Sequence, residues 1–377
     1  MRKFLSLICL LCVTLNTYAQ QKNIDAEINQ LMQKMQAVGL LVAVIKNNKL
    51  IYSNAWGKKD IEKNTDLGTT DVFRIASISK SFSATAIMQL VEAKKLSLDD
   101  DFGKLIGFSI RNPKFPDKVI TLRMILSHTS SINDSEGYFN LDVINPDKNP
   151  NWAKCYSNNE PGSTYDYCNL NFNMTGAVIE KITGSRFDNY IRKNILEPLN
   201  FYGNYCVDSL DANRFATLYE YNASKNSFDA SPAAYAPRRE ELSKYILGYS
   251  TPILSPTGGM KTTATDLAKY MQMHMNYGKA NGKRIISKES AKTMQTGIAN
   301  NGKYGLALTS TNIIEGKTLK GHTGSAYGLY SAMFFDPEEK FGFVAITNGC
   351  NSSYANQHSE LVLGECLQIL YRNFIQK

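Results

Sequence analysis

The order of strand-like and helix-like segments is the feature that most restricts how this chain can fold. Two pairs of short β-rich runs, each pair joined by a turn, lie near opposite ends of the 377 residues: 40–45 with 50–55, and 331–335 with 342–347. Between about residues 77 and 290 the periodicity is mainly helical. We therefore expect both ends to meet in one antiparallel sheet, with a helical region inserted between them.

Apolar residues at helical spacing add the remaining elements. They occur at both ends and in the middle of the chain: 24–38, 77–95, 169–182, 265–275 and 360–374. The prediction is an α+β protein with a sheet lobe of about residues 20–76 and 290–377, flanked by terminal helices, and a mainly helical lobe of about 77–289. The cleft between the lobes is the natural place for a site. Residues 207–250 show no clear periodicity, and we interpret them as an irregular insertion that shapes the pocket.

The first nineteen residues have the pattern of a secretory signal peptide. Arg2 and Lys3 precede an apolar stretch at 4–15, and Thr17-Tyr18-Ala19 forms a small-x-small site. This predicts cleavage after Ala19, a single mature domain over 20–377, and a periplasmic or secreted protein. The apolar stretch is shorter than the about 20 residues that cross a bilayer, so we expect no integral membrane segment after cleavage.

Composition excludes several other classes of protein. The formal net charge is +8, but the sequence contains no long run of Lys or Arg, so we expect no nucleic-acid partner. The four histidines lack metal-site spacing and no phosphate-binding glycine loop occurs, so we expect neither metal nor cofactor. Beyond the leader the cysteines are odd in number, and the fold is not expected to depend on disulfides: Cys155, Cys168, Cys206, Cys350 and Cys366.

Ser77 and Lys80 are the candidate nucleophile and base. They are three residues apart at the start of a helical pattern, so their side chains share one face. A serine hydroxyl needs a neighbouring base to become a strong nucleophile, and a lysine can be that base if its surroundings favour the neutral amine. The alternative for this spacing alone is a helix-capping serine followed by a solvated lysine.

Residues 73–80, Phe-Arg-Ile-Ala-Ser-Ile-Ser-Lys, resemble the active-site segment of the β-lactamase-related serine hydrolases. That family includes class C β-lactamases, D-Ala-D-Ala carboxypeptidases, D-aminopeptidases and esterases. Residues 120–130 and 256–268 are similar to later family segments, and the likeness spans most of 38–350. The resemblance implies the two-lobed fold and acyl transfer through an ester on Ser77, without a cofactor.

A second family segment matches Tyr167-Cys168-Asn169. Other Tyr-x-Asn triplets occur, but only this one follows Pro161-Gly162 at the family distance and precedes a helix-like run. The resemblance implies that Tyr167 is a second acid/base and that Asn169 hydrogen-bonds Lys80 and the substrate amide. Cys168 replaces the usual serine or alanine and introduces an oxidisable thiol near the site.

The third family segment matches His322-Thr323-Gly324-Ser325. By resemblance it lies on an edge strand that pairs with substrate, and the N–H groups of Ser77 and Ser325 form an oxyanion hole. We expect glycine at 324 because a side chain there would block the substrate. His322 stands where many relatives have lysine, and a neutral imidazole is a weaker partner for a substrate carboxylate. His128 is expected to be structural.

These residues predict a monomeric, exported serine hydrolase that cleaves an amide or ester of a small molecule or peptide, with D-amino-acid peptides or esters as candidate substrates. A class C-type β-lactamase or D-Ala-D-Ala carboxypeptidase is the alternative enzyme. A penicillin-binding sensor with slow turnover is the alternative of another class. In each case Tyr167 or Lys80 would activate the deacylating water.

Overall fold

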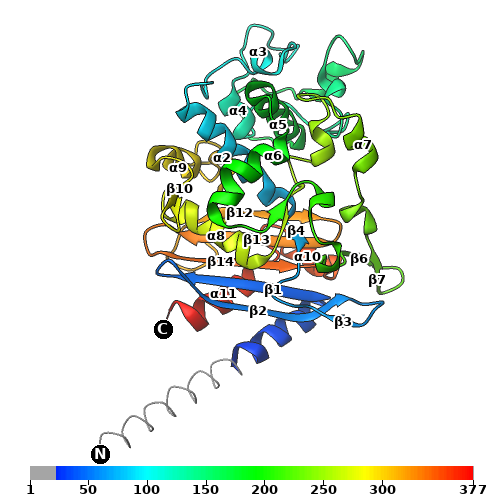
Figure 1. The fold of residues 1–377 in the computed structure, drawn as a ribbon, viewed down its shortest axis with the longest axis vertical. Coiled ribbons are helices and arrows are strands. Elements are labelled where there is room, and N and C mark those ends of the chain that lie inside the picture. Colours follow the sequence, from blue (N-terminus) through cyan, green and yellow to red (C-terminus); the bar gives the residue numbers. More distant parts are fainter. Residues whose placement is uncertain (1–22, 377) are drawn as a thin grey trace, which may run out of the picture.

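The computed structural model describes residues 23–376 and is built around one antiparallel sheet (Figure 1). The seven strands are ordered β11-β12-β13-β14-β1-β2-β3. Their bounds are β1 Gly39–Lys46, β2 Lys49–Asp60, β3 Thr65–Asp66, β11 Thr309–Thr311, β12 Leu319–Ala326, β13 Leu329–Asp336 and β14 Phe341–Thr347. Pairing of β1 with β14 joins the two ends of the chain, as the sequence predicts. The predicted signal peptide lies outside the described residues.

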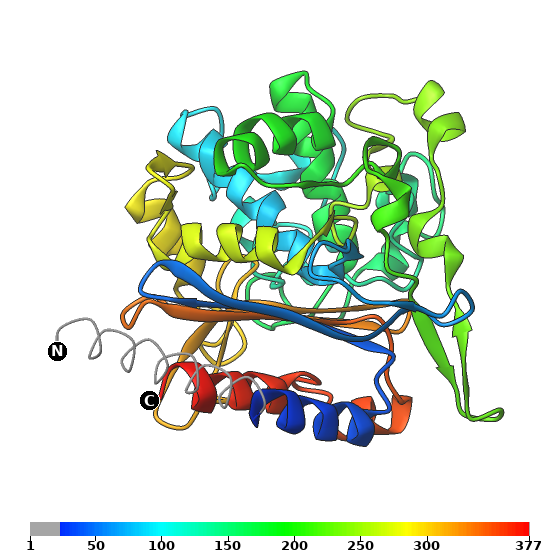
Figure 2. The same cartoon turned by 60° about the horizontal axis from the view of Figure 1, so that its bottom comes forward.

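Strand β1 shows how the sheet separates two hydrophobic layers. Its side chains alternate between faces, so Leu41 and Ile45 pack with the helical region while Leu40 and Val42 pack with the terminal helices. The terminal layer contains a helix over residues 23–35 together with α10 (Ser352–Gln357) and α11 (Gly364–Phe374) (Figure 2). The predicted terminal helices and the α+β fold class are confirmed.

The opposite face of the sheet carries the helical region. Its helices are α2 Ser79–Glu92, α3 Phe102–Ile106, α4 Leu122–Leu126, α5 Asn169–Thr183, α6 Phe187–Ile191, α7 Arg239–Ser243, α8 Ala264–Met275 and α9 Lys288–Gln295. Helix α8 packs directly across β14, β1 and β13. One hydrophobic cluster contains residues of α2, α5, α8 and the sheet. The predicted sheet lobe and helical lobe therefore share one continuous core.

The middle of the chain is less uniformly helical than its periodicity indicates. It contains short strands in three small sheets: β4 Phe73–Arg74 with β8 Lys261–Thr262 and β5 Gly203–Asn204, β6 Tyr219–Asn222 with β7 Ser227–Ala230, and β9 Lys279–Ala280 with β10 Lys283–Arg284. Two-residue strands are too short to give an alternating pattern. The β6–β7 hairpin and α7 are the regular parts of the 207–250 segment.

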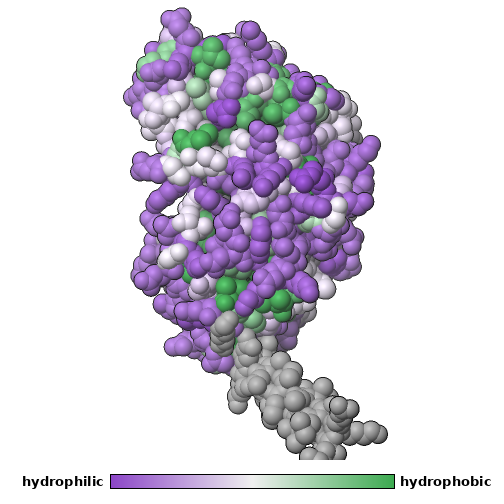
Figure 3. Space-filling view, turned by 90° about the vertical axis from the view of Figure 1, so that its left-hand side faces the viewer, coloured by the Kyte–Doolittle hydropathy of each residue, from purple (hydrophilic) through white to green (hydrophobic). Residues whose placement is uncertain are grey.

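The surface is mostly hydrophilic in the face that Figure 3 shows, with hydrophobic residues in separate groups. Within residues 23–376, none of the helices combines the length and hydrophobicity needed to cross a membrane. The five cysteines of this part of the chain are all buried and unpaired. The described region therefore contains no disulfide, and packing, hydrogen bonds and ion pairs stabilise it.

Candidate active site

Ser77 lies in a tight turn between the small sheet and helix α2. The turn is a single 3₁₀ helix, η1 (Ala76–Ile78), that follows β4, and Ala76 adopts a positive φ of 46°. A left-handed conformation is uncommon for a residue with a side chain, and such strain is frequent at functional turns. Residues on both sides are buried, whereas Ser77 is half-buried and faces a cavity.

Gly324 on β12 lets this turn approach the sheet. A Cβ atom at Gly324 would lie 2.3 Å from the Ile75 carbonyl oxygen, and that oxygen also accepts a hydrogen bond of 2.9 Å from Ser331 Oγ. We expected glycine at 324 because a side chain would block the substrate, and this reason is incomplete. A side chain at 324 would also collide with the backbone that leads into Ser77.

Lys80 is completely buried beside Ser77, which rules out the alternative of a solvated lysine. Its Nζ lies 3.1 Å from Ser77 Oγ, 2.8 Å from Asn169 Oδ1 and 3.0 Å from the Thr257 carbonyl oxygen. Burial lowers the pKa of Lys80 to about 7, although the carboxylate of Asp134 opposes this change. Both the neutral and the charged amine are thus accessible near neutral pH.

The hydrogen-bond partners of Lys80 define the role of each atom in the neutral state. Thr257 offers a carbonyl oxygen, which only accepts. Asn169 is fixed with Oδ1 toward Lys80, because its Nδ2 donates to Asp134 (2.9 Å) and its Oδ1 accepts from Thr257 Oγ1 (3.0 Å). A neutral amine has two N–H groups, and these two acceptors use both. Its lone pair then faces the one partner that can donate, the hydroxyl of Ser77.

Asp134 holds the start of α5 and was missed in the sequence. Its carboxylate accepts hydrogen bonds from the backbone N–H groups of Asn169 (2.8 Å) and Leu170 (2.9 Å). These N–H groups at a helix start have no partner within the helix, so a carboxylate from another segment caps it. Asp134 thereby sets the direction in which the Asn169 amide points.

Tyr167 lies across the cavity from the nucleophile and contacts both predicted partners. Its ring lies 4.7 Å from Lys80 Nζ, and the Ser77 side chain is close enough to influence its pKa. Burial raises the pKa of Tyr167 above its ordinary value, while the nearby Ser77 hydroxyl opposes the rise. The tyrosine is protonated at neutral pH.

His128 supports the Tyr167 loop from behind. Its ring centroid is 4.2 Å from that of Tyr167, and its Nδ1 accepts a hydrogen bond of 3.1 Å from the N–H of Cys168. Burial, followed by the charges of Lys80 and His322, lowers the pKa of His128 well below its ordinary value. The imidazole is therefore a neutral acceptor that positions the loop, in agreement with the structural role we expected.

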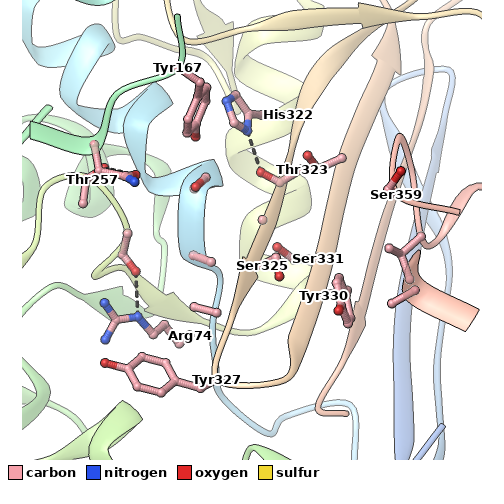
Figure 4. Close-up of a pocket in the computed structure, with 18 of the residues that line it drawn as sticks. Arg74, Tyr167, Thr257, His322, Thr323, Ser325, Tyr327, Tyr330, Ser331 and Ser359 are labelled. Carbon is pink, nitrogen blue, oxygen red and sulfur yellow. Dashed lines mark hydrogen bonds between the residues drawn. The ribbon is translucent and has the colours of Figure 1, made fainter. Parts of the chain in front are cut away.

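His322 is buried and fully engaged by its neighbours. Its Nδ1 lies 2.5 Å from the Thr323 carbonyl oxygen (Figure 4), and its Nε2 lies 3.2 Å from the hydroxyl of Tyr304. Since a carbonyl only accepts, Nδ1 donates, and the neutral ring accepts the Tyr304 hydroxyl at Nε2. Burial lowers the pKa of His322 to about 4. The imidazole is uncharged at neutral pH, which strengthens the expectation that it binds a carboxylate weakly.

The predicted residues gather around one cavity of about 760 Å³ at the edge of β12. Ser77, Tyr167 and Asn169 line it from the helical side, and His322 to Ser325 line it from the strand. Strand β11 pairs only with the first residues of β12, up to Gly321, so the following edge lies open toward the cavity. Lys80 is placed behind this lining. The structure thus brings together all eight residues that the sequence singled out.

No group of three or more His, Cys, Asp or Glu side chains with metal-binding geometry occurs in the part of the chain that the structure describes. The expectation that the protein needs no metal stays a prediction.

Comparison with known sequences places this arrangement in a family. The sequence profile described as Beta-lactamase matches residues 24–364. The chain belongs to the Beta-lactamase family. Protein flp of Staphylococcus aureus (strain MRSA252) is 25% identical over 354 residues, which cover 90% of this chain and 64% of the relative. Penicillin-binding protein 4 of Amycolatopsis lactamdurans is 27% identical over 317 residues, which cover 79% of this chain and 78% of the relative.

Solved structures confirm the fold of this Beta-lactamase family member. The octameric penicillin-binding protein homologue from Pyrococcus abyssi has a TM-score of 0.72 at 24% identity, covering 91% of this chain and 78% of that one. D-amino acid amidase from Ochrobactrum anthropi SV3 has a TM-score of 0.71 at 18% identity, covering 94% and 99%. Since one neighbour is described as octameric, our expectation of a monomer stays a prediction.

Family membership supports a serine hydrolase in general terms. The chain spans 64% of the length of protein flp, so the activity and partners of that whole protein do not carry over. The sequence motifs identify eight residues of the site, but they omit several that position them. Asp134 and Tyr304 contact the site only through tertiary packing. Thr257 lies in the family-like segment 256–268 and lines the cavity, but the sequence did not single it out.

Proposed function

We propose that the protein hydrolyses an amide or ester through an acyl-enzyme on Ser77. The observation that carries this proposal is the arrangement around Lys80, whose two other partners accept hydrogen bonds and leave its lone pair for the serine hydroxyl. A pKa lowered to about 7 provides the neutral amine that a general base must be.

The reaction follows from these positions. Ser77 Oγ attacks the carbonyl carbon of the substrate while Lys80 takes the hydroxyl proton. The N–H groups of Ser77 and Ser325 stabilise the negative oxygen of the tetrahedral intermediate. Tyr167, protonated at neutral pH, passes a proton to the leaving group and regains one from Lys80. Water then attacks the Ser77 ester while Lys80 accepts its proton, directly or through the Tyr167 hydroxyl, and this proton returns to Ser77 Oγ as the acid product leaves.

The candidate substrates are D-amino-acid amides, peptides and esters. The similarity to a D-amino acid amidase supports this choice, as does the neutral state of His322 at the end of the cavity. A substrate whose free carboxylate must bind at position 322 would find no positive charge there. β-Lactams remain the second candidate, because penicillin-binding protein 4 is among the relatives.

Labelling with a fluorophosphonate tests the nucleophile. We expect wild-type protein to lose activity and gain one label on the peptide that contains Ser77, and Ser77→Ala to remain unlabelled. Ser79→Ala is the matched control and should still be labelled, since Ser79 Oγ accepts from the Met260 N–H and is fully buried. A folded wild type that resists the probe would contradict the mechanism.

Turnover then separates the substrate classes. D- and L-amino-acid p-nitroanilides, short-chain p-nitrophenyl esters and nitrocefin are compared by kcat/KM. Preference for a D-amino-acid amide supports the main proposal, and nitrocefin turnover supports the β-lactamase alternative. Stable labelling by a fluorescent penicillin, without turnover of any substrate, would support the sensor alternative.

We also propose that the protein is exported after removal of residues 1–19. The charged start, the apolar stretch and the small-x-small site support this proposal. Mass spectrometry of the protein's N-terminus after expression in a bacterium with intact export should find Gln20 first. An uncleaved chain in the cytoplasmic fraction would contradict it.

A further inference from the structure

A second cavity of about 230 Å³ adjoins the active-site cavity. The two share the lining residues Arg74, Phe139, Ser255 and Tyr327. The lining of the second cavity also includes Lys261 of β8, which pairs with Arg74 of β4 in the small sheet before Ser77. Two cationic residues on neighbouring strands therefore line a cavity next to the nucleophile's turn.

Both cations are more than nine-tenths buried and retain unused donor capacity. Lys261 is 6% exposed, and its Nζ donates one hydrogen bond of 2.6 Å, to the Tyr205 carbonyl oxygen. Arg74 is 9% exposed, and its Nε donates to the Gly258 carbonyl oxygen at 2.8 Å (Figure 4). The contacts of its two terminal nitrogens, to the Ala234 carbonyl oxygen and Ser255 Oγ, are long at 3.5 and 3.4 Å.

The carboxylates around this cavity are committed to other cations. Glu241 pairs with Arg238 at 2.6 Å, and Asp208 pairs with Arg239 at 3.1 Å. Within residues 23–376, no carboxylate forms an ion pair with Arg74 or Lys261. Burial, followed by the charge of Arg74, lowers the pKa of Lys261 well below its ordinary value. Burial without a counter-charge therefore favours the neutral amine of Lys261. An anion placed between Lys261 and Arg74 would favour the ammonium form and offset the cost of burying both charges.

We propose that the cavity beside Arg74 binds a carboxylate or a small oxyanion, held by the Lys261 ammonium and the Arg74 guanidinium. The anion can be a free ion or a carboxylate on the acyl part of the substrate. The assignment to a substrate carboxylate rests on the proposed function. Either would lie behind the nucleophile's turn, away from His322. This position would give the enzyme an anion subsite that is independent of the residue replacing the family lysine.

Thermal unfolding of the full chain in sodium phosphate and sodium acetate tests the binding site. Against sodium chloride at equal ionic strength, we expect either anion to raise the Tm of wild type by about 2 °C or more. Lys261→Met keeps the apolar stem but removes the charge, and should abolish this response. Lys283→Met, an exposed change on β10, is the matched control and should respond like wild type.

The same response in Lys261→Met as in wild type would overturn the proposal, as would no response in wild type. Lys261→Gln is the second variant if the methionine variant does not fold. Ser77→Ala should keep the full Tm response, so loss of the proposed catalysis and loss of the anion site give different results.

A pair of substrates decides the source of the anion. The mono-p-nitrophenyl ester of adipate carries an acyl carboxylate that the hexanoate ester lacks. If the substrate supplies the anion, wild type should prefer adipate in kcat/KM, and Lys261→Met should lower this preference about tenfold. If wild type and Lys261→Met show the same preference for adipate over hexanoate, and phosphate still raises the Tm of wild type, the site binds a free ion.

Discussion

The two faces of the central sheet differ in the polarity of the side chains that they bury. Between the sheet and the terminal helices the buried side chains are mainly apolar, with Asn373 of α11 as a buried polar residue. On the other face, a core of similar character also encloses the amine of Lys80, the amides of Asn171 and Asn173, and a row of hydroxyls. The first face needs only complementary shapes, whereas the second must also provide hydrogen-bond partners for most of its buried polar groups.

Helices α11 and α2 show this difference residue by residue. Leu367 and Leu370 of α11 are fully buried in the terminal layer. In α2 the buried side chains include Ser79, Ser83 and Thr85, which bond to the Met260 N–H, the Pro256 carbonyl oxygen and the Tyr270 hydroxyl. The comparison indicates that the terminal face provides stability and that the helical face accepts an energetic cost to keep the base buried.

Lys80→Met is the largest test of this contrast. The unfolded chain holds the Lys80 proton up to pH 10.5, whereas the folded chain releases it near pH 7, so this lysine destabilises the fold at all pH values below 10.5. The variant should lose at least about 10³-fold in kcat/KM. Its free energy of unfolding at pH 7 should rise by roughly 1–3 kcal/mol, because lost hydrogen bonds offset part of the gain.

Substrate kinetics and urea unfolding at pH 7 measure both effects of Lys80→Met. Lys95→Met, an exposed change just beyond α2, is the matched control and should leave activity and stability close to wild type. A Lys80→Met protein that is clearly less stable than wild type would show that burial of the base has no net cost.

Leu367→Ala tests the stabilising role of the terminal face. Removing this buried side chain of α11 should lower the free energy of unfolding by about 2–4 kcal/mol, because the cavity is only partly filled by relaxation. At 25 °C, kcat/KM should change less than about twofold. Leu170→Ala, an equal truncation beside Asn169, should lower both quantities. Equal loss of activity in the two variants would remove the distinction between the faces.

How far the sequence predicts the molecule also differs between the two faces. The helices predicted at 24–38 and 360–374 and the β1–β2 and β13–β14 hairpins have long, regular patterns, and the sequence places them, whereas it does not predict the six-residue α10. On the helical face, spacing pairs Ser77 with Lys80, because the two residues are close in sequence, and the family resemblance adds Tyr167. Neither can find Asp134, which meets Asn169 across 35 residues, or the two-residue strands that hold the turn.

Asp134→Asn tests the part of the polar face that the sequence did not reveal. In wild type, kcat/KM should fall as the pH drops below about 7, where Lys80 becomes protonated. The Asp134 carboxylate raises the pKa of Lys80, so the amide should move this acidic limb to lower pH. Weaker capping of α5 should also reduce the plateau about tenfold. A pH–rate profile checks both, with the exposed Asp147→Asn as control. An unchanged or upward-shifted limb would contradict the role given to Asp134.

Cys168→Ala should have the smallest effect, although Cys168 stands between two site residues. Its Sγ donates a hydrogen bond to Asp134 Oδ1 at 3.2 Å, and burial raises its pKa well above the ordinary value. A buried thiol that keeps its proton is a poor nucleophile, so the oxidisable group suggested by the sequence should be inert in the folded protein. We expect less than a twofold change in kcat/KM. Iodoacetamide should label the Cys168 peptide after unfolding but not before, and rapid labelling of the native protein would show that the loop opens.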